Sequence, residues 1–573
     1  MFKLISLLVV GLALTFKNGN GEAIEDLKES EWWENASLYQ IYPRSFQDSD
    51  GDGVGDLKGI TSRLEYLKEI GITATWLSPI FESPMADFGY DISNFTRIDP
   101  TFGTLDDFDE LIAKAKQLGV KILLDFVPNH SSDQSVWFQK SVKREPGFED
   151  FYMWHDGKVD PENPTQRLPP SNWKSLFGGP MWTWHEERQQ YYLHQFLAEQ
   201  PDFNYSNPLV RQNMLDVLGY WLERGVDGFR IDAVPHIFEA RNDDGSFPDE
   251  DKSGGSSDST TYAYYTHKYT KDQYPTIELL YEWRAYLDDF RAKNGGDSRI
   301  LLTESASPID FLSLAVSNAT HQGAQIPMNF NLMDLTSSST ALDLETLANN
   351  WMDTIWKNHQ SANWLVGNHD CSRVGNRVGR NKIDLVNIIV HSLPGTSITY
   401  YGEELGMIDA VIECTPSHCG DRDAERSPMQ WNSEANAGFS QAATTWLPLA
   451  QDYELYNVET ESQIGHSTLQ IFKALQELKK TSAFKNTKGD GGFSYKALTE
   501  EIFQIIRAVP DKEEYMILVN MSDKLQYVEN LSSKTYEYVL MNTYSPHTEG
   551  DKADLSGRLY LLPNEAVILK WIV

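Results

Sequence analysis

The residues best suited to chemistry are four carboxylates that each follow a short apolar run: Asp125, Asp232, Glu304 and Asp370. Three basic side chains lie close to them in the sequence: Arg230, His130 and His369. A single Asp after a strand commonly caps a helix, but four at four strand ends are poorly explained by capping. Glycoside hydrolysis needs two such groups across one bond, one protonated and one ionised. A metal site built from His and Asp is the competing interpretation, and spacing alone does not assign roles.

The elements that must position these carboxylates are eight short β-rich runs at 38–43, 74–79, 121–127, 228–234, 299–304, 325–330, 362–370 and 397–402. The segments between them, such as 62–71 and 108–120, show helical periodicity ending in glycine. Alternation of apolar strands with helices predicts a parallel sheet, and eight repeats predict an α/β fold of the (β/α)₈ TIM-barrel type. Chemistry in such a barrel sits at the carboxyl ends of the strands. An open doubly wound sheet is the alternative architecture.

Two stretches break the alternation. Residues 131–199 are rich in Trp, Pro and Gly, show little helical period, and separate the third run from the fourth. From about residue 484 the pattern changes to short alternating strands, which predicts a C-terminal antiparallel β domain. The expected division is a leader at 1–21, a barrel at 22–130 and 200–483, an inserted lobe (domain B) at 131–199, and a β domain at 484–573.

The N-terminus predicts export. One Lys is followed by LISLLVVGLALTF, an apolar run of 13 that is too short to span a bilayer and typical of a signal peptide, with Gly19 and Gly21 before a cleavage point. An uncleaved anchor is the alternative, and no other run reaches spanning length. The formal charge of −34 disfavours nucleic acid and anionic lipid as partners and suits neutral or cationic ones.

Seven sequons agree with secretion, and they are Asn35, Asn94, Asn129, Asn204, Asn318, Asn520 and Asn530. Asn129 is the exception among them, because a glycan beside His130 would fill the expected site. Three cysteines allow one disulfide. We expect Cys414 to pair with Cys419 across the short TPSH loop, which leaves Cys371 over and buried.

The acidic stretch DSDGDGVGD (48–56) looks at first like an EF-hand loop. Its twelfth position is Gly59 rather than the required Glu, and the run before it reads as a strand, not a helix. A calcium-sensor role is therefore excluded. A hard cation held by the Asp oxygens is expected, with a merely solvated acidic turn as the alternative.

Seven motifs, in order, resemble the signature regions of glycoside hydrolase family 13, the α-amylase family. They are GITATWLSP (71–79), DFVPNH (125–130), QPDFN (200–204), GFRIDAVPH (228–236), LLTES (301–305), VGNHD (366–370) and GTSITYYGEE (395–404). The resemblance runs from about residue 30 to the C-terminus. QPDFN is similar to the oligo-1,6-glucosidase and α-glucosidase branch, and with the leader and sequons the chain resembles digestive insect maltases.

The resemblance implies a role for each site residue. Asp232 matches the nucleophile, Glu304 the general acid/base, and Asp370 the carboxylate that grips sugar hydroxyls. Arg230 would keep the nucleophile ionised. The residues that match binders of the first glucose are His130 and His369 as hydrogen-bond donors and Tyr90 as the stacking platform. The implied reaction retains the α configuration.

Two further sets follow from the same resemblance. In exo-acting relatives, the residues corresponding to Asp87 and Arg422 close the pocket on the non-reducing glucose, with Arg426 in support; a surface ion pair is the alternative for Arg422. One structural Ca²⁺ would be held by Asp48, Asp50, Asp52, Val54 and Asp56. At Ala233, relatives that prefer α-1,6 bonds carry Val, and α-1,4 enzymes carry a smaller or hydroxylated residue.

The expected function is a secreted, retaining, exo-acting α-1,4-glucosidase for maltose and short malto-oligosaccharides, with sucrose as a further expected substrate. Heavy chains of amino-acid transporters share this fold without catalysis, but they need a spanning helix and lose the catalytic carboxylates. A docking-receptor role on a gut surface is neither favoured nor excluded by any feature of the sequence.

Overall fold

The computed structural model describes residues 31–359, 361–413, 422–487 and 491–572 of the 573-residue chain. The predicted leader and the predicted Cys414–Cys419 pair lie outside the described residues. None of the helices within the described ranges has the length and hydropathy needed to cross a bilayer.

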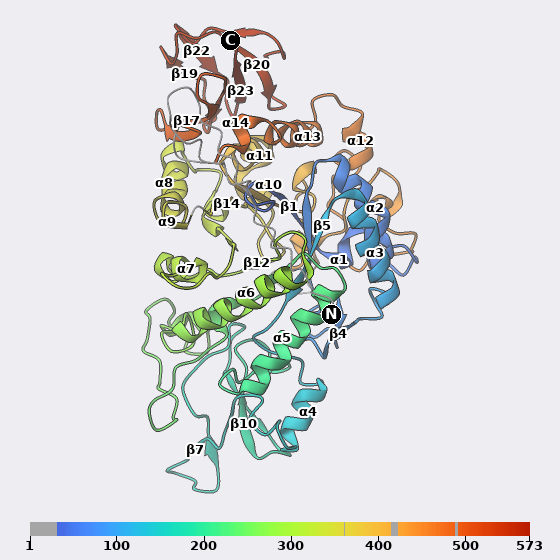
Figure 1. Cartoon of the computed structure of the whole chain (residues 1–573), viewed down its shortest axis with the longest axis vertical. Helices are drawn as coiled ribbons and strands as arrows, with labels where there is room; N and C mark the ends of the chain where they lie inside the picture. Colours follow the sequence, from blue (N-terminus) through green and yellow to red (C-terminus); the bar gives the residue numbers. More distant parts are fainter. Residues whose placement is uncertain (1–30, 360, 414–421, 488–490, 573) are drawn as a thin grey trace, which may run out of the picture.

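An eight-stranded parallel sheet forms the centre of the molecule (Figure 1). Its strands coincide with the eight predicted runs, although β1 and β15 each begin one residue earlier than predicted. They are β1 (Ser37–Ile41), β2 (Ala74–Leu77), β5 (Lys121–Phe126), β11 (Gly228–Ile231), β12 (Ile300–Thr303), β13 (Ile326–Pro327), β14 (Asn363–Trp364) and β15 (Thr396–Tyr400). The order β13-β12-β11-β5-β2-β1-β15-β14 follows the chain around a ring without reversal. The barrel prediction is confirmed, and the doubly wound alternative, which requires a reversal of strand order, is wrong.

Two asparagine side chains connect β13 and β14, the first and last strands of this order. The Asn363 Nδ2 amide donates to the backbone oxygen of Pro327 at 2.6 Å, and the Asn329 backbone N–H donates to Asn363 Oδ1 at 2.9 Å. Asn329 Nδ2 in turn donates to the Asn363 carbonyl at 3.1 Å. Both side chains are fully buried. The seam between the two-residue strands β13 and β14 is therefore bridged by side chains.

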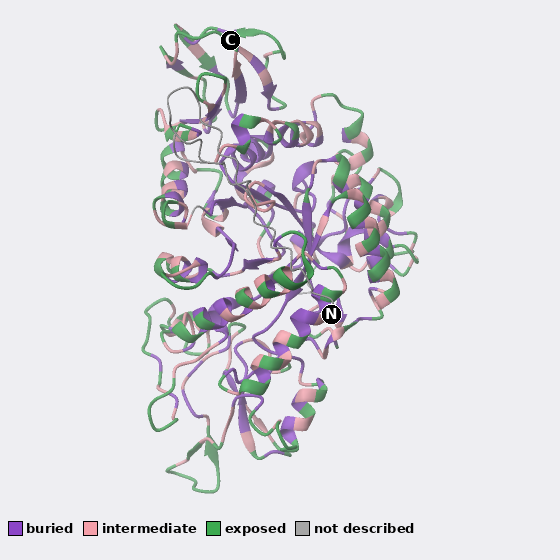
Figure 2. Ribbon diagram, in the orientation of Figure 1, coloured by how far each residue is buried: buried purple, intermediate pink, exposed green. Residues whose placement is uncertain are grey.

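Helices surround the barrel with their apolar faces inward, so that the strands are buried and the outer helix faces exposed (Figure 2). The principal ones are α2 (Leu57–Glu69), α3 (Leu105–Leu118), α5 (Pro208–Glu223), α6 (Tyr274–Asn294), α7 (Ile309–Val316), α8 (Ala341–Trp351), α11 (Ile383–Ser392) and α13 (Thr468–Lys479). Helix α3 shows how the local sequence determines where a helix begins and ends. Thr104 and Asp107 form a capping box at its start, and Gly119 ends it in the left-handed conformation at φ 71°.

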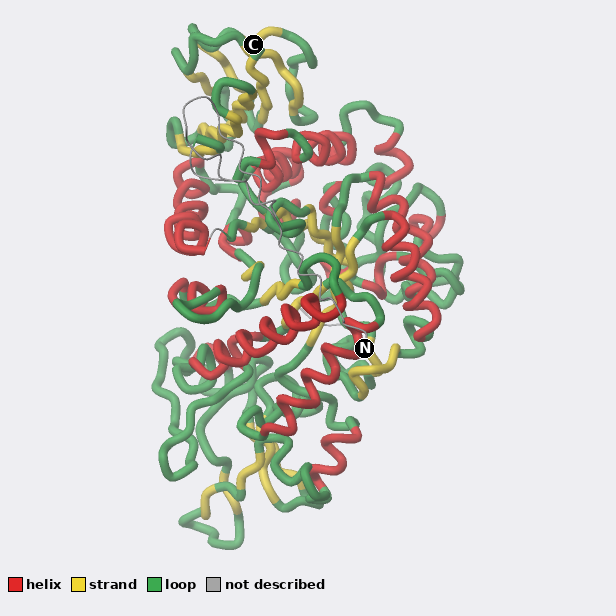
Figure 3. Tube along the Cα trace, in the orientation of Figure 1, coloured by secondary structure: helices red, strands yellow, loops and turns green. Residues whose placement is uncertain are grey.

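The segment between β5 and α5 is a lobe built mostly of loops, at the lower end of Figure 3. Its regular elements are α4 (Val136–Val142), β6 (Trp154–His155), β7 (Lys158–Val159), β8 (Arg167–Leu168), β9 (Trp182–His185) and β10 (Gln190–Leu193). A separate aromatic core that includes Trp173, Trp182 and Phe247 holds it together. Phe247 comes from beyond β11, so the lobe packs with a later part of the chain. The boundaries 131–199 remain a prediction.

The C-terminal part forms an antiparallel sheet of order β16-β17-β18-β23-β20-β21, at the upper end of Figure 1. Its strands are β16 (Phe493–Ala497), β17 (Ile502–Val509), β18 (Glu513–Asn520), β20 (Tyr536–Met541), β21 (Lys552–Ala553) and β23 (Ala566–Trp571), with β19 (Gln526–Glu529) and β22 (Arg558–Leu561) pairing separately. One face shares a hydrophobic core with α8, α11 and α13. This sheet therefore braces the barrel helices.

Candidate active site

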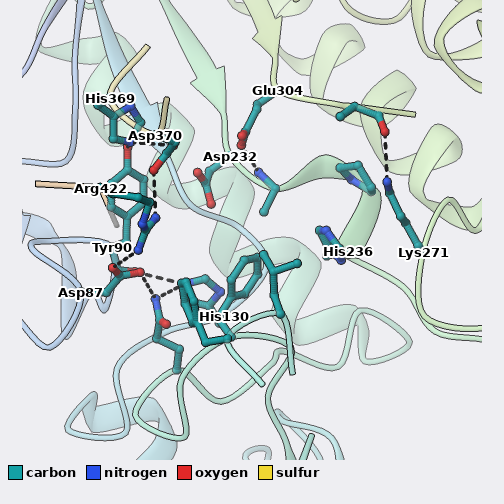
Figure 4. Close-up of a pocket in the computed structure, with 17 residues that line it drawn as sticks. Asp87, Tyr90, His130, Asp232, His236, Lys271, Glu304, His369, Asp370 and Arg422 are labelled. Carbon is teal, nitrogen blue, oxygen red and sulfur yellow. Dashed lines mark hydrogen bonds and ion pairs between the residues drawn. The ribbon is translucent and has the colours of Figure 1, made fainter. Parts of the chain in front are cut away.

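A cavity of about 320 Å³ opens at the carboxyl ends of the barrel strands. Nearly all of the predicted catalytic and sugar-binding residues line it together (Figure 4). These are Asp87, Tyr90, His130, Asp232, Glu304, His369, Asp370 and Arg422. Arg230 lies directly beneath, in β11. Parallel strands place residues that are far apart in sequence at one rim, which is why the motifs converge.

Arg230 is the centre of the charged cluster. Its Nη1 lies 2.8 Å from Asp125 Oδ1 and 2.7 Å from Asp232 Oδ1, and its Nη2 lies 3.0 Å from Glu304 Oε2. The Arg230 side chain is only 3% exposed. One buried guanidinium thus contacts three carboxyl groups from three neighbouring strands.

Burial, together with an excess of carboxyl groups over cations, sets the pKa values of this cluster. Burial raises the pKa of Asp232 well above its usual range, and the charges of Glu304 and Asp125 add to this effect against the opposing charge of Arg230. Burial likewise raises the pKa of Asp125 to about 6, again against Arg230. The charge of Arg230 favours ionised Asp232, but burial and the like charges outweigh it, so the pairing does not lower the pKa of Asp232 as predicted. The arrangement favours retaining a proton among these carboxyl groups.

A second charged cluster closes one end of the cavity. Arg422 Nη1 lies 2.8 Å from Asp370 Oδ1, and Arg422 Nη2 lies 3.3 Å from Asp87 Oδ1. Arg426 Nη2 lies 2.9 Å from the same Asp370 oxygen. Burial opposes ionisation of Asp370, but His369 and the two guanidinium groups together hold the pKa of Asp370 below its usual range. Arg422 therefore joins the pocket rather than forming a surface ion pair.

His369 and Tyr90 are fixed by a chain of hydrogen bonds. Gln40 Nε2 lies 2.8 Å from His369 Nδ1 and can only donate, so His369 carries its proton on Nε2. That Nε2 lies 2.8 Å from the Tyr90 hydroxyl and 3.2 Å from Asp370 Oδ2. Burial lowers the pKa of His369 to about 3, so the ring is neutral at pH 7. The Tyr90 and His369 rings are parallel within 4°, with centroids 5.5 Å apart.

His130 is also buried, which lowers its pKa to about 3. Its Nε2 lies 3.1 Å from the Tyr90 carbonyl, and its Nδ1 lies 3.1 Å from Asn129 Nδ2. Both ring nitrogens of His130 thus already face protein groups, as do both of His369. To donate a hydrogen bond to a sugar, either histidine would have to give up one of these contacts with protein groups. The sequence motifs do not reveal this constraint.

Ala233, expected to read the linkage, also lines the cavity. Several other lining residues were not predicted as site residues. They are Leu176, Phe177, Phe196, Gln200, Pro235, His236, Lys271 and Ala306. Gln200 and His236 lie inside the quoted QPDFN and GFRIDAVPH motifs, so the signal for them was present. Phe177 and Lys271 come from loops without a motif, and only folding brings them to the cavity.

His236 lies at the end of the cavity opposite Asp87 and Arg422, beside Lys271 (Figure 4). Gln195 Nε2 donates to the His236 carbonyl at 2.7 Å and to Glu239 Oε1 at 2.8 Å, so Gln195 Oε1 faces His236 Nδ1 at 2.9 Å. His236 must therefore carry its proton on Nδ1. Burial lowers the pKa of His236 to about 3, which leaves a neutral ring with Nε2 as an acceptor.

Ala233 has an unusual backbone. It adopts φ 50° and ψ 35°, the left-handed region that non-glycine residues rarely occupy. Its N–H donates to Glu304 Oε2 at 3.0 Å. The residue after Asp232 therefore helps to position Glu304 by a strained turn.

The acidic loop gathers three of its predicted ligands. Oxygens of Asp48, Asp50 and Asp56 all lie within 4.8 Å of one another, a donor set suited to a hard cation such as Ca²⁺. Asp52 is not part of that group, which differs from the predicted ligand set. Its Oδ1 accepts the Val54 N–H at 2.7 Å instead. Asp48 is already bonded by the N–H groups of Gly51 and Gly53 at 2.7 and 2.8 Å, so the loop is preformed.

The predicted sequons differ in accessibility. Asn530 is exposed, and Asn35, Asn94 and Asn318 are half-buried. Asn520 is fully buried with its Nδ2 donating to the Leu562 carbonyl at 2.7 Å, and Asn204 is 8% exposed with its Nδ2 on the Asp150 carbonyl at 2.9 Å. A glycan attaches through that nitrogen, so glycosylation of Asn204 and Asn520 does not fit the folded chain. Asn129 is buried, in keeping with the prediction that it stays unmodified.

Cys371 has a free thiol and is half-buried rather than buried as predicted. It follows Asp370 at the rim of the cavity, where the backbone leaves the barrel interior. Burial raises the pKa of the Cys371 thiol, so the thiolate is disfavoured at neutral pH.

Comparisons with known proteins agree with the geometry. The sequence matches the family profile described as Alpha amylase, catalytic domain, over residues 40–487. It is 63% identical over 548 residues to Maltase A2 of Drosophila melanogaster, with 96% of each chain covered. It is 48% identical over 502 residues to a salivary alpha-glucosidase of Aedes aegypti, with 85% of each covered. The solved structure of an alpha-glucosyl transfer enzyme superposes with a TM-score of 0.80 at 31% identity, covering 95% of this chain and 100% of that one.

Proposed function

Because the chain belongs to the α-amylase family, glycoside hydrolase family 13, we propose that it is a secreted, retaining α-1,4-glucosidase. It removes single glucose units from the non-reducing ends of maltose and short malto-oligosaccharides, and it also hydrolyses sucrose. The relatives named maltase and alpha-glucosidase support the reaction class. The observation that carries the proposal is the single Arg230 guanidinium that holds Asp232 and Glu304 together at a cavity closed at one end.

In this mechanism, Asp232 attacks the anomeric carbon while Glu304 gives its proton to the glycosidic oxygen. A covalent glucosyl–Asp232 ester forms and the leaving sugar departs with that proton. Glu304, now ionised, takes a proton from water, and the resulting attack on the anomeric carbon releases α-glucose and restores both carboxyl groups. Arg230 stays within 3.0 Å of both groups and offsets the negative charge that moves between them.

The closed end of the cavity supports exo action. Arg422 bridges Asp87 and Asp370 across that end, and the ring of Phe177 lies 5.1 Å from the Arg422 guanidinium. A glucan chain cannot pass through such a bridge, so only a terminal glucose fits with its anomeric carbon at Asp232. The polar groups that converge there would bond its hydroxyls, and unpaired polar groups would penalise a sugar lacking them.

The test is the identity of the first product. Proton NMR during hydrolysis of sucrose or maltotriose, whose leaving sugars are not glucose, should detect α-glucose before mutarotation, and digestion of a long glucan should release glucose without internal fragments. First appearance of β-glucose would exclude retention, and early formation of oligosaccharides would exclude exo action. Absence of maltose hydrolysis would overturn the proposed function itself.

Secretion is supported by the apolar N-terminal run and by relatives named as salivary enzymes. Expression of the full chain in insect cells should deliver activity to the medium, with a mature N-terminus near residue 22. Recovery of all activity in the cell pellet with an intact Met1 would contradict this. Peptide mass spectrometry of the same sample should find glycans at Asn530 and none at Asn129.

For the acidic loop we propose one structural Ca²⁺ held by Asp48, Asp50 and Asp56, 4.8 Å or less apart. The cation would relieve the repulsion among these carboxylates and stabilise the loop that follows β1. A ligand that binds only the folded state stabilises it by about 2.7 kcal/mol at a hundred times its dissociation constant.

The melting temperature should therefore rise with added Ca²⁺ in the wild type and stop responding in Asp50→Asn. Asp52→Asn is the matched control, because its carboxylate lies outside the group. Substrate constants measured below the melting temperature should not change. Immediate loss of turnover on chelation, with the fold intact, would indicate a catalytic metal instead.

A further inference from the structure

A second cavity of about 630 Å³ adjoins the candidate active site. We call it the side cavity, and it is lined by Ser305–Ser307, parts of α7, the residues after β13, and the C-terminal end of α8 with the turn that follows. Ala306 lines both cavities, so the loop Ser305–Ser307 is their common wall. This loop begins directly after Glu304, so the wall between the two cavities starts beside the proposed general acid.

The wall is held firmly on both sides. Ser305 Oγ and Ser307 Oγ lie 2.6 Å apart, and Ser307 bonds Asp272. From the other face, Lys271 Nζ donates to the Ala306 carbonyl at 3.0 Å. The far side of the cavity is equally fixed, because Tyr495 of the C-terminal sheet donates to Asn349 Oδ1 at 2.8 Å. The side cavity is a built feature rather than a gap between loose loops.

Its lining has a consistent chemistry. In the part of the chain that the structure describes, no Lys, Arg or His lines it, whereas Asp334 and Asp353 offer carboxylates and Asn349 and Asn350 offer amides. Phe330 adds a half-exposed aromatic ring to these acceptors and donors. An anion would be repelled. Among the described residues, the carboxylates of Asp334 and Asp353 do not gather with a third metal-binding group. An aromatic face beside several hydrogen-bonding groups suits a neutral polyhydroxy ligand.

A turn of π-helix contributes two residues to the lining of the side cavity. After α8 ends at Trp351, residues Met352–Trp356 form a π-helical turn, and Asp353 and Thr354 from this turn line the cavity. Such turns are rare and occur frequently at functional sites. Asn350 and Asp353 are both exposed at this point, so their side chains are available to a ligand.

We propose that the side cavity binds glucose units of the leaving chain, beyond the one bonded to the cleaved oxygen. This proposal rests on the proposed α-glucosidase function. Arg422 closes one end of the active site, so a longer substrate extends past His236 and Lys271 at the opposite end (Figure 4). The Ala306 carbonyl bonds Lys271 there. Ala306 is the point where that path meets the side cavity. The enzyme therefore gains affinity for malto-oligosaccharides from a surface that maltose is too short to reach.

The experiment compares chain lengths. In Asn350→Ala and Asp353→Ala, kcat/KM for maltotetraose and maltohexaose should fall about tenfold, as expected for loss of a hydrogen bond of about 1.4 kcal/mol, mostly through KM. The value for maltose should stay within twofold. Asn358→Ala and Asp310→Ala are matched controls, because both residues are exposed on or next to the same elements but do not line the cavity.

Binding gives an independent readout. Calorimetry on Glu304→Gln should show maltotetraose binding that Asp353→Ala weakens about tenfold, with maltose binding unchanged. Equal losses for maltose and maltotetraose, or no loss for either in the variants, would overturn the side-cavity proposal. Wild-type hydrolysis of maltose would still stand in that case, so the outcome is distinct from failure of the proposed function.

Discussion

The two ends of the active-site cavity are built differently. At one end, Asp87, Arg422 and Asp370 form a linked set of ion pairs at 2.8–3.3 Å, supported by Arg426. At the other end, His236 is neutral, Lys271 bonds a backbone carbonyl, and Ala306 is exposed. Ion pairs that share partners fix one geometry, whereas single hydrogen bonds and apolar contacts tolerate several.

The contrast has an energetic meaning. Arg422 is partly buried, so removing it leaves Asp87 and Asp370 without a shared cation in a site that water screens only in part, which costs more than the loss of a surface ion pair. Changing a small apolar contact alters discrimination by only about 1–3 kcal/mol. We therefore expect the closed end to set which terminal sugar is accepted, and the open end to tune the leaving group.

The largest loss of activity should follow substitution of the carboxyl groups that lie between the two ends of the cavity. Asp232→Asn and Glu304→Gln should each lower kcat for maltose by at least about 10³-fold, because an amide replaces neither nucleophile nor acid. The melting temperatures should change little. Stopped assays provide the measurement, and mass spectrometry of the protein provides the control by excluding deamidation of the new amide back to the acid. A fully active Asp232→Asn protein would place the chemistry elsewhere.

Breaking the closed end should give the next effect. Arg422→Ala leaves Asp87 and Asp370 without their shared cation, so kcat/KM for maltose should fall about 10²–10³-fold, corresponding to about 3–4 kcal/mol. Arg224→Ala is the control. Arg224 Nη1 lies 2.8 Å from Asp109 Oδ1 in a partly exposed ion pair that does not line the cavity. If both variants kept normal kinetics, the closed end would not be a recognition surface.

At the open side, Ala233→Val should raise the ratio of kcat/KM for isomaltose to that for maltose by about 10- to 200-fold. The added methyl groups would crowd the edge that receives the leaving sugar. Val should also lower the free energy of unfolding by about 1–2 kcal/mol, because Ala233 sits at φ 50°. Chemical denaturation separates the two effects. An unchanged ratio in folded protein would mean that the linkage is read by other residues.

The smallest predicted effect is a shift in pH dependence. Burial is the main cause of the raised pKa of Asp232, and the negative charge of Asp125 adds to it. Asp125→Asn removes that charge, so the pKa of Asp232 should fall and the acidic limb of kcat/KM should move to lower pH. Activity at the acidic edge should rise relative to the optimum. A limb that moved to higher pH would show that Asp125 assists ionisation of Asp232.

The sequence predicts repeated elements best, together with the residues that the topology brings together. The eight strands were visible as apolar runs, and parallel strands necessarily bring Asp232, Glu304 and Asp370 to one rim. The sequence predicts poorly those side-chain states that depend on residues far away in the chain. The tautomer of His369 is set by Gln40, 329 positions away, and the buried state of Asn520 depends on Leu561 and Leu562. The left-handed turn at Ala233 and the departure of Asp52 from the carboxylate group have no local signal at all.

The junction between β13 and β14, bridged by Asn329 and Asn363, is the place where the barrel should open locally most easily. Every other junction in the ring is a ladder of backbone hydrogen bonds, but β13 and β14 are bridged through Asn329 and Asn363. Local opening should therefore start there, and backbone amides in β14 should exchange with deuterium faster than those in β1 or β2. Phe330 lines the side cavity and follows Asn329 directly, so such openings would reach the side cavity.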